Sequence, residues 1–242
     1  MTLPSPRYPE IDLLRTVAIL SMVVYHAAFD LDQLYGWDWD VLTGYWRLFA
    51  RATAILFLLV SGMSFAISWD RSPRWSKAWK RAIVVLGAGV FVSGATYAIS
   101  PDDYVRFGIL HLIGAAALLL PLMASLKEGN FFFGILFIWL GTILGSMRID
   151  TSLLLPLGLM PHEFVTLDYF PIAPWFGVLL IGSGLGHLLY IRSTVWRKHL
   201  PSLVLFPSYF VLFSHHSLLI YLLHQPLLIL LLTLLFGWPE SW

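Results

Sequence analysis

Cysteine is absent from the 242-residue sequence, and charged side chains are scarce. Without cysteine the chain can form no disulfide, offer no thiolate to a metal and supply no cysteine nucleophile. Only 12% of the residues are charged, well below the roughly one quarter typical of soluble domains. The formal net charge of +1 excludes the strongly basic composition of many nucleic-acid-binding proteins. We therefore expect no nucleic-acid partner.

Apolar residues dominate what is present. Hydrophobic residues make up 58% of the chain and the mean hydropathy is +0.77, which is typical of a membrane protein. A helix needs about 20 apolar residues to cross a bilayer. The sequence predicts a polytopic all-α membrane protein, one domain over 1–242, with about seven transmembrane helices. They are expected near 11–30, 49–68, 79–98, 106–125, 131–147, 171–190 and 214–236.

The orientation follows from the basic residues. Lys and Arg concentrate in "DRSPRWSKAWKR" (70–81) and "RSTVWRKH" (192–199), and such loops are cytoplasmic as a rule. With seven spans the N-terminus is then cytoplasmic and the C-terminus external. A cleaved signal peptide is the alternative for the first run, but Asp12 and His26 fit poorly in its apolar region. We expect a multi-pass protein of the cell membrane.

The stretch "YPEIDLLRTVAILSMVVYHAAFD" (8–30), which contains the first predicted span, carries Asp12, Arg15, His26 and Asp30 along a mostly apolar segment. At about 100° per residue, Asp12, Arg15, His26 and Asp30 fall within a sector of roughly 60°. His26 lies roughly 16 Å along the axis from Arg15, past the middle of the hydrocarbon. An ionisable group at that depth usually marks a functional site.

Two structural alternatives stand beside this reading. Arg15 with Asp12 is also typical of an interfacial anchor, and His26 of a residue that hydrogen-bonds between helices. Asp30 lies four residues after His26 and is expected to hydrogen-bond the imidazole, fixing its tautomer and raising its basicity.

The spacing of Arg15 and His26 in "IDLLRTVAILSMVVYH" resembles the first-helix motif of the transmembrane acyltransferase superfamily, which includes acyltransferase family 3. The segments "EIDLLR", "RFGILHLIG", "LDYFPIAPWFGV" and "HSLLIYLLHQP" are similar to prokaryotic relatives of the catalytic domain of heparan-alpha-glucosaminide N-acetyltransferase. The resemblance covers most of the chain. It implies transfer of an acetyl or other acyl group from cytoplasmic acyl-CoA to an extracytoplasmic acceptor, often the amine or hydroxyl of a sugar in a glycan.

Roles for the first span follow from this expectation. An imidazole with a pKa near neutrality suits general-base catalysis, so we assign the base to His26, with Asp30 orienting it. Arg15 is expected to bind a phosphate of coenzyme A, because a guanidinium forks onto phosphate oxygens. The pattern leaves open whether His26 is transiently acylated or acts only as a base. No metal is expected.

The segment "RFGILHLIG" (106–114) supplies a second imidazole. His111 lies roughly 8 Å below Arg106, near the predicted depth of His26, so the two imidazoles are candidates to share one cavity. His111 is the reserve catalytic residue, and Arg106 is assigned to the acceptor. A histidine packed against a neighbouring helix is the alternative.

The motif "HSLLIYLLHQP" carries Ser217, Tyr221 and His224 at i, i+4 and i+7, which places them on one helical face. This polar stripe is a candidate wall of the acyl-CoA site, or alternatively a ladder of hydrogen bonds between helices. His215 and His216 lie at its cytoplasmic end, where phosphate contact and an interfacial role are both open.

The segment 148–170 is predicted to lie outside the membrane and to dip into the protein. We expect His162, Asp168 and Tyr169 to cover the outer mouth of the site and to contact the acceptor. A simple interfacial loop is the alternative.

Two other functional classes use the same intramembrane groups. A proton-coupled transporter uses buried Asp, Arg and His as a relay. A b-type haem protein uses histidine pairs such as His26 and His111 as axial ligands. The acyltransferase is the preferred interpretation, with the lipid bilayer as a partner and a second copy of the chain as a candidate partner.

Overall fold

The computed structural model describes residues 8–193, 214 and 216–239, and within them the chain is all-α, as predicted. Two isolated β-bridges occur in this part, without a strand. The α-helices are α1 (Pro9–Tyr35), α2 (Gly44–Arg71), α3 (Trp75–Ile99), α4 (Ile109–Met123), α5 (Asn130–Ser146), α6 (Ile172–Gly186) and α9 (Ser217–Phe236). Shorter helical turns are η1 (Ala124–Gly129), η2 (Leu155–Leu157) and the π-helical η3 (His187–Arg192).

Six helical stretches in the described residues are long and apolar enough to cross a membrane. One of them, Ile109–Ser146, spans 38 residues and contains both α4 and α5. The two helices are separated by η1, where Lys127 adopts a φ of 53°, a backbone conformation that breaks a helix. The prediction of seven spans is therefore not confirmed, and the cytoplasmic N-terminus stays a prediction.

The helices form two compact units. One unit contains α1, the part of α2 up to Phe57, and α9; the other runs from Leu58 to the end of η3. We call them the α1–α9 unit and the α2–α6 unit. The single-domain assignment stays a prediction.

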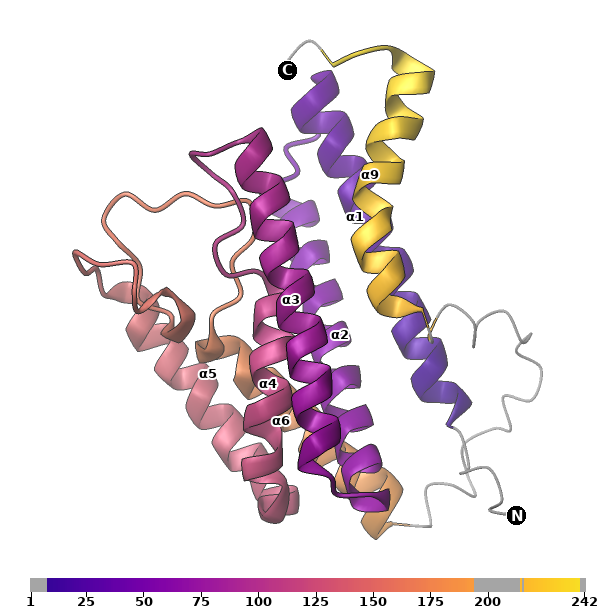
Figure 1. The fold of residues 1–242 in the computed structure, drawn as a ribbon, viewed down its shortest axis with the longest axis vertical. Coiled ribbons are helices and arrows are strands. Elements are labelled where there is room, and N and C mark those ends of the chain that lie inside the picture. Colours follow the sequence, from indigo (N-terminus) through magenta and orange to yellow (C-terminus); the bar gives the residue numbers. More distant parts are fainter. Residues whose placement is uncertain (1–7, 194–213, 215, 240–242) are drawn as a thin grey trace. The chain divides into compact units, whose positions relative to one another are not determined.

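In the α1–α9 unit, α1 and α9 pack side by side although they lie at opposite ends of the sequence (Figure 1). Pro9 opens α1, and Glu10 and Asp12 in its first turn complement the helix dipole. Gly36 ends α1 in the left-handed region, with a φ of 68°, which glycine adopts without steric cost. The pairing places the polar face of α1 beside the polar stripe of α9.

In the α2–α6 unit, glycines bring helices into close contact. A Cβ atom at Gly182 would collide with the backbone of Leu59, and one at Gly186 with that of Met63. The "GSGLG" segment therefore packs α6 closely against α2, as such small-residue spacings favour. In "GTILG", Gly141 packs against Pro174, whereas a Cβ atom at Gly145 would meet nothing within 4 Å.

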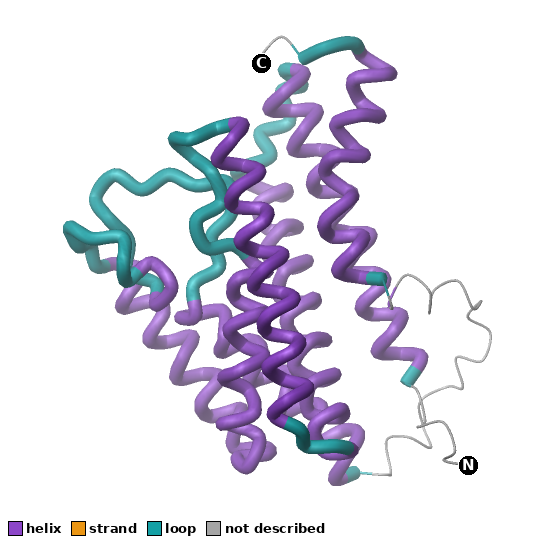
Figure 2. Tube along the Cα trace, viewed as in Figure 1, coloured by secondary structure: helices purple, strands orange, loops and turns teal. Residues whose placement is uncertain are grey.

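The long connection between α5 and α6 folds back on the connection between α3 and α4 (Figure 2). Leu167 N–H donates to Asp103 O over 2.7 Å, and Phe170 N–H donates to Phe107 O over 2.8 Å. These main-chain bonds hold the two loops together at one end of the unit, where Asp168 and Tyr169 lie.

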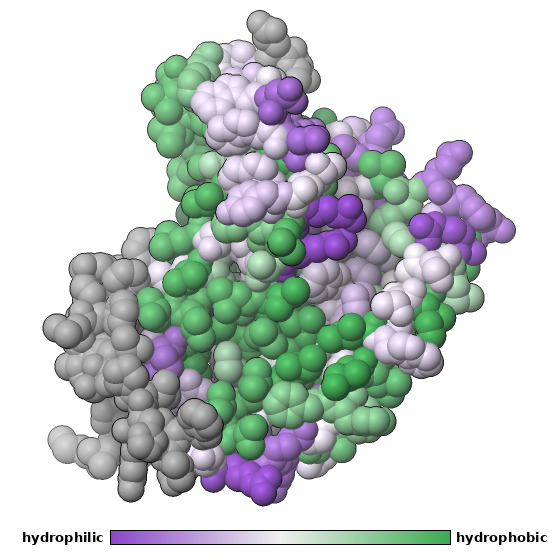
Figure 3. All heavy atoms as spheres, turned by 180° about the vertical axis from the view of Figure 1, so that it is seen from behind, coloured by the Kyte–Doolittle hydropathy of each residue, from purple (hydrophilic) through white to green (hydrophobic). Residues whose placement is uncertain are grey.

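Large apolar side chains are widely exposed on the helices, and Figure 3 shows them gathered across one face. On α3, Phe91 is 67% exposed, and on α9 Leu234 is 76% exposed. Soluble proteins rarely expose continuous apolar surface on this scale. We conclude that these faces contact lipid.

Candidate active site

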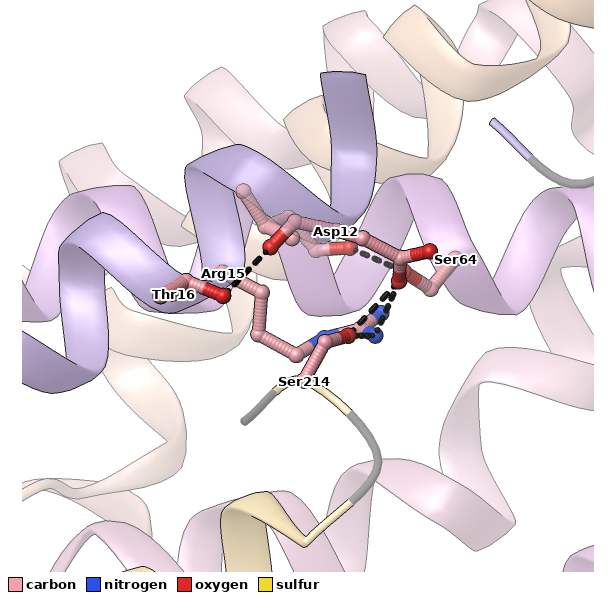
Figure 4. Close-up of polar contacts among 6 residues, drawn as sticks. Asp12, Arg15, Thr16, Ser64 and Ser214 are labelled. Carbon is pink, nitrogen blue, oxygen red and sulfur yellow. Dashed lines mark hydrogen bonds and ion pairs between the residues drawn. The ribbon is translucent and has the colours of Figure 1, made fainter. Parts of the chain in front are cut away.

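The cytoplasmic end predicted for α1 holds a compact polar cluster around Arg15 (Figure 4). Arg15 Nη1 donates to Ser214 Oγ over 2.6 Å and lies 3.3 Å from Asp12 Oδ1. Ser214 Oγ in turn donates to Asp12 Oδ1 over 2.6 Å, and Thr16 Oγ1 donates to the main-chain oxygen of Asp12 over 2.9 Å. Asp12 is thus the ionic partner of Arg15. A phosphate bound at Arg15 would be a second anion beside the Asp12 carboxylate.

Further along α1, His26 is held in one tautomer by its own helix. Its Nδ1 lies 2.9 Å from Met22 O. Because a carbonyl oxygen only accepts hydrogen bonds, Nδ1 carries the proton in the neutral imidazole. The lone pair is therefore on Nε2, the atom that a general base needs to have free.

His224 of α9 packs against His26. The ring centroids are 4.8 Å apart, with the rings inclined by 73°. His224 Nδ1 donates to Tyr221 O over 2.6 Å, so the same argument places the His224 lone pair on Nε2. This Nε2 is buried and has no hydrogen-bond partner in the described residues. Two basic imidazole nitrogens therefore occur in one small region between α1 and α9.

Asp30 lies one turn beyond His26 but bonds to a different partner from the one predicted. Asp30 is 1% exposed, and its Oδ1 accepts a hydrogen bond of 2.6 Å from Gln225 Nε2. The predicted bond between Asp30 and His26 is wrong for this structure, because the nearby carbonyl of Met22 takes the imidazole N–H instead. Asp30 therefore links α9 to α1 through Gln225.

The remaining residues of the α9 stripe are placed as follows. Ser217 and Tyr221 lie on α9 and are partly buried, and His216 directly precedes the helix and is exposed. His215 lies outside the described residues, as does most of the basic segment 192–199. The assignment of His216, Ser217, Tyr221 and His224 to the acyl-CoA site stays a prediction.

In the α2–α6 unit, His111 has the opposite tautomer. Gly108 N–H donates to His111 Nδ1 over 3.3 Å, so Nδ1 holds the lone pair and Nε2 carries the proton. The ring also packs against Phe107 with centroids 5.4 Å apart. His111 therefore offers a donor at Nε2 where His26 offers a lone pair. The predicted cavity shared by His26 and His111 would join the two units and stays a prediction.

Asp168 binds the beginning of α4. Its Oδ2 accepts a hydrogen bond of 3.0 Å from Ile109 N–H, in the first turn of that helix, where a negative charge is stabilised by the helix dipole. A Cβ atom at Gly108 would collide with the same carboxylate oxygen. Asp168 thus joins the α5–α6 connection to α4 through its side chain.

Burial changes the ionisation of the two neighbouring acids in this loop. Burial raises the pKa of Asp168 to about 6, although main-chain N–H groups of Ile109 and Tyr169 favour its charged form. Burial also raises the pKa of Tyr169 to about 12. The Tyr169 hydroxyl donates to Leu155 O over 2.8 Å, which ties the loop to η2.

Arg106 and His162 lie in different surroundings. The Arg106 guanidinium carbon is 5.2 Å from the ring centre of Tyr104 and 5.6 Å from that of Phe164, within the range of a cation–π contact. His162 is 69% exposed, and its Nε2 lies 3.7 Å from Asp150 Oδ1. The contacts of Arg106, His162, Asp168 and Tyr169 with an acceptor stay predictions.

The sequence of the chain matches one known family over most of its length. Residues 7–226 match the family described as heparan-alpha-glucosaminide N-acetyltransferase, catalytic. The chain belongs to this family. No curated protein and no solved structure matches it. The matched residues contain both histidine sites, and the family makes the chain a membrane protein of the acetyltransferase class.

Sequence reasoning missed two residues of the polar contacts between α1 and the segment that contains Ser214 and α9. Ser214 bridges Asp12 and Arg15, and Gln225 holds Asp30. Gln225 follows His224 directly in "HQP", so an amide next to an intramembrane imidazole was a signal that the sequence contained. Ser214 gave no comparable signal, because a single serine is common at the end of a membrane helix. Within the described residues no three His, Asp or Glu side chains form a metal-binding group.

Proposed function

We propose that the protein is an integral membrane acetyltransferase that takes the acetyl group from cytoplasmic acetyl-CoA. The acceptor is proposed to be an amine or hydroxyl, typically of a sugar, on the extracytoplasmic side. The observation that carries the proposal is the His26 tautomer, because its Nε2 lone pair lies on an intramembrane helix of a chain that belongs to an acetyltransferase family. Such a nitrogen suits the removal of a proton from an acceptor.

The proposed reaction needs one base and two substrates. The acceptor nitrogen attacks the carbonyl carbon of the thioester, and His26 Nε2 takes the proton that the nitrogen loses. The carbon–sulfur bond then breaks, and the departing thiolate of coenzyme A receives that proton from His26. The products are the acetylated acceptor and free coenzyme A, and His26 returns to its starting tautomer.

Neighbouring residues position this base. The His224 ring packs on the His26 ring with the ring centroids 4.8 Å apart, and the Asp30–Gln225 bond holds α9 beside α1 one turn further along. Arg15 is proposed to contact a phosphate of the donor, with Asp12 and Ser214 fixing the direction of its guanidinium. Arg106 is proposed to contact the acceptor.

The experiment that tests the function uses purified, reconstituted full-length protein. Labelled acetyl-CoA is supplied with glucosamine, and the acetylated amine is quantified by mass spectrometry. We expect product only when protein, donor and acceptor are all present. Movement of the acceptor across the membrane without acetyl-CoA and without acetylated product would instead identify a transporter.

A further inference from the structure

The contact between α1 and α9 contains several buried acceptor atoms that lack a donor. Within the described residues, Asp30 Oδ2, Gln225 Oε1 and His224 Nε2 are buried and have no hydrogen-bond partner. His26 Nε2 carries a further lone pair, because its Nδ1 holds the proton. Buried polar groups are normally paired. These acceptors therefore point to a ligand that brings its own N–H groups.

Asp30 adds a negative charge to the same region. It is 1% exposed, and its carboxylate accepts its hydrogen bond from the neutral amide of Gln225. The ion pairs found in the described part of the chain do not include Asp30. A buried carboxylate without a cation is costly. A ligand that supplies both N–H groups and a positive charge is an ammonium ion.

An amine acceptor reaches the protein mainly as such an ion. An amino group whose pKa is about 8 is roughly 90% protonated at pH 7, and the ammonium form has no lone pair with which to attack a thioester. Two protons must leave its nitrogen, one before the attack and one as the amide forms. The proposed transfer begins with the neutral amine and uses His26 for the second proton. A further base would let the enzyme use the abundant ammonium form.

We propose that His224 is a second catalytic base, which takes the first proton from the ammonium form of the acceptor. The assignment rests on the proposed acetyltransferase function, which supplies the acceptor. His224 Nδ1 donates to Tyr221 O, so the lone pair is on the buried Nε2. The His224 ring lies beside His26, with the ring centroids 4.8 Å apart. His224 thereby takes a role other than the contact with acyl-CoA predicted from the α9 stripe.

The protons balance over one turnover. His224 Nε2 takes one proton, which leaves a neutral amine and an imidazolium ion. Two imidazolium rings at the distance of His26 and His224 repel each other, so His224 releases its proton to water before His26 takes the next. The amine attacks the thioester, and His26 passes its proton to the thiolate of coenzyme A. Each turnover converts the ammonium ion and acetyl-CoA into acetylated amine, coenzyme A and one released proton.

Other titratable groups near His224 decide how a pH profile is measured. In the described residues, His26 and Asp30 lie on α1, and Tyr221 lies on α9 with its ring centroid 5.6 Å from that of His224. Tyr25 packs against the His26 ring. Tyrosine ordinarily titrates near pH 10, whereas His26 can titrate in the same range as His224. Each variant is therefore compared with the parent at the same pH, so that titration of His26 affects both.

The test measures kcat/KM for glucosamine against pH in reconstituted full-length protein. His224→Asn keeps an N–H for the carbonyl of Tyr221 but has no basic nitrogen at the Nε2 position, so it can use only the free amine. With an amine pKa of about 8, its kcat/KM should fall about a hundredfold below the parent at pH 6 and only about twofold at pH 8. His224→Phe, which keeps an aromatic ring beside His26, should give the same profile.

A second acceptor separates the base from a packing role. Methoxyamine is a weakly basic amine that is neutral over this pH range, so no first proton has to be removed. His224→Asn should acetylate it as fast as the parent at both pH values. Leu223→Ala is the matched control, because Leu223 directly precedes His224 and is 46% exposed. It should match the parent with both acceptors, and insertion of every variant is checked by size-exclusion chromatography.

The outcomes separate the second base from the proposed function. A loss with glucosamine that is equal at pH 6 and pH 8, or equal for both acceptors, would show that His224 only packs against His26 and overturns the second base. A His224→Asn variant as active as the parent at pH 6 overturns it as well. If the parent itself acetylates neither amine, the proposed function is contradicted, and the second base with it.

Discussion

His26 and His111 lie in two separate units and present opposite hydrogen-bonding faces. His26 donates through Nδ1 to the carbonyl of Met22, whereas His111 accepts through Nδ1 from the N–H of Gly108. The first arrangement leaves a lone pair on Nε2 and the second leaves a proton there. The main chain around each ring therefore decides which histidine is suited to act as a base, although both lie on apolar helices.

The largest effect is expected at His26. His26→Asn keeps a side-chain N–H for the carbonyl of Met22 but has no basic nitrogen at the Nε2 position. Acetyl transfer should fall about a hundredfold or more, the usual contribution of a general base. The rate is measured with saturating donor, and insertion is checked by size-exclusion chromatography. A folded variant with nearly full activity would show that His26 serves packing alone.

Substitution of Arg15 should weaken binding of the donor acetyl-CoA rather than slow the chemical step. Arg15→Gln should raise the KM for acetyl-CoA about tenfold, the cost of one charged phosphate contact, and leave the KM for the acceptor unchanged. The control is Arg15→Gln combined with Asp12→Asn, because it removes the charge on Asp12 that the single variant would leave without its partner. Equal increases in both KM values would argue against the phosphate role.

Substitution of His111 by Asn should slow acetyl transfer less than substitution of His26 by Asn. The two variants therefore test the difference between the two histidines directly. His111→Asn retains an acceptor for the N–H of Gly108. Transfer should change by less than about tenfold, below the contribution expected of a base. The measurement is run beside His26→Asn in one preparation. A larger loss at His111 than at His26 would reverse the assignment of the base.

Asp168 should give the smallest effect, visible in stability against pH. Burial raises its pKa from 3.8 to about 6, so the folded state binds a proton more tightly than the unfolded state. The tighter proton binding stabilises the folded state below about pH 4, and this stabilisation is lost as the pH rises to about 6. The melting temperature of Asp168→Asn, which stays neutral, should rise relative to the parent between these values. If the melting temperature of Asp168→Asn minus that of the parent is constant or falls with pH, the raised pKa of the buried Asp168 carboxyl is contradicted.

The sequence predicted the helices well because each is a long apolar run. The predicted span 79–98 lies within α3, and 131–147 agrees with α5 within one residue at each end. The separation of α4 and α5 was also visible in "KEGN", where Lys127 takes a positive φ. Local composition carries these features, so no knowledge of tertiary contacts was needed.

The site was predicted less completely, because its partners come from distant helices. Spacing alone placed Asp30 within reach of His26, but it gave no account of Gln225, which is 195 positions away in the chain and takes the carboxylate. The pairing of His26 with His224 likewise depends on how α1 packs against α9. Helix periodicity predicts on which face of its helix a residue lies. Tertiary packing decides which residue of another helix it contacts.

The claim that the acetyl group crosses the membrane is tested most directly in sealed vesicles of known orientation. Acetyl-CoA is supplied only on the side that carries residues 70–81, and glucosamine is confined to the other side. We predict acetylated glucosamine in the acceptor compartment for the parent protein and a loss of about a hundredfold or more for His26→Asn. Product that forms only when donor and acceptor share one compartment would contradict transfer across the membrane.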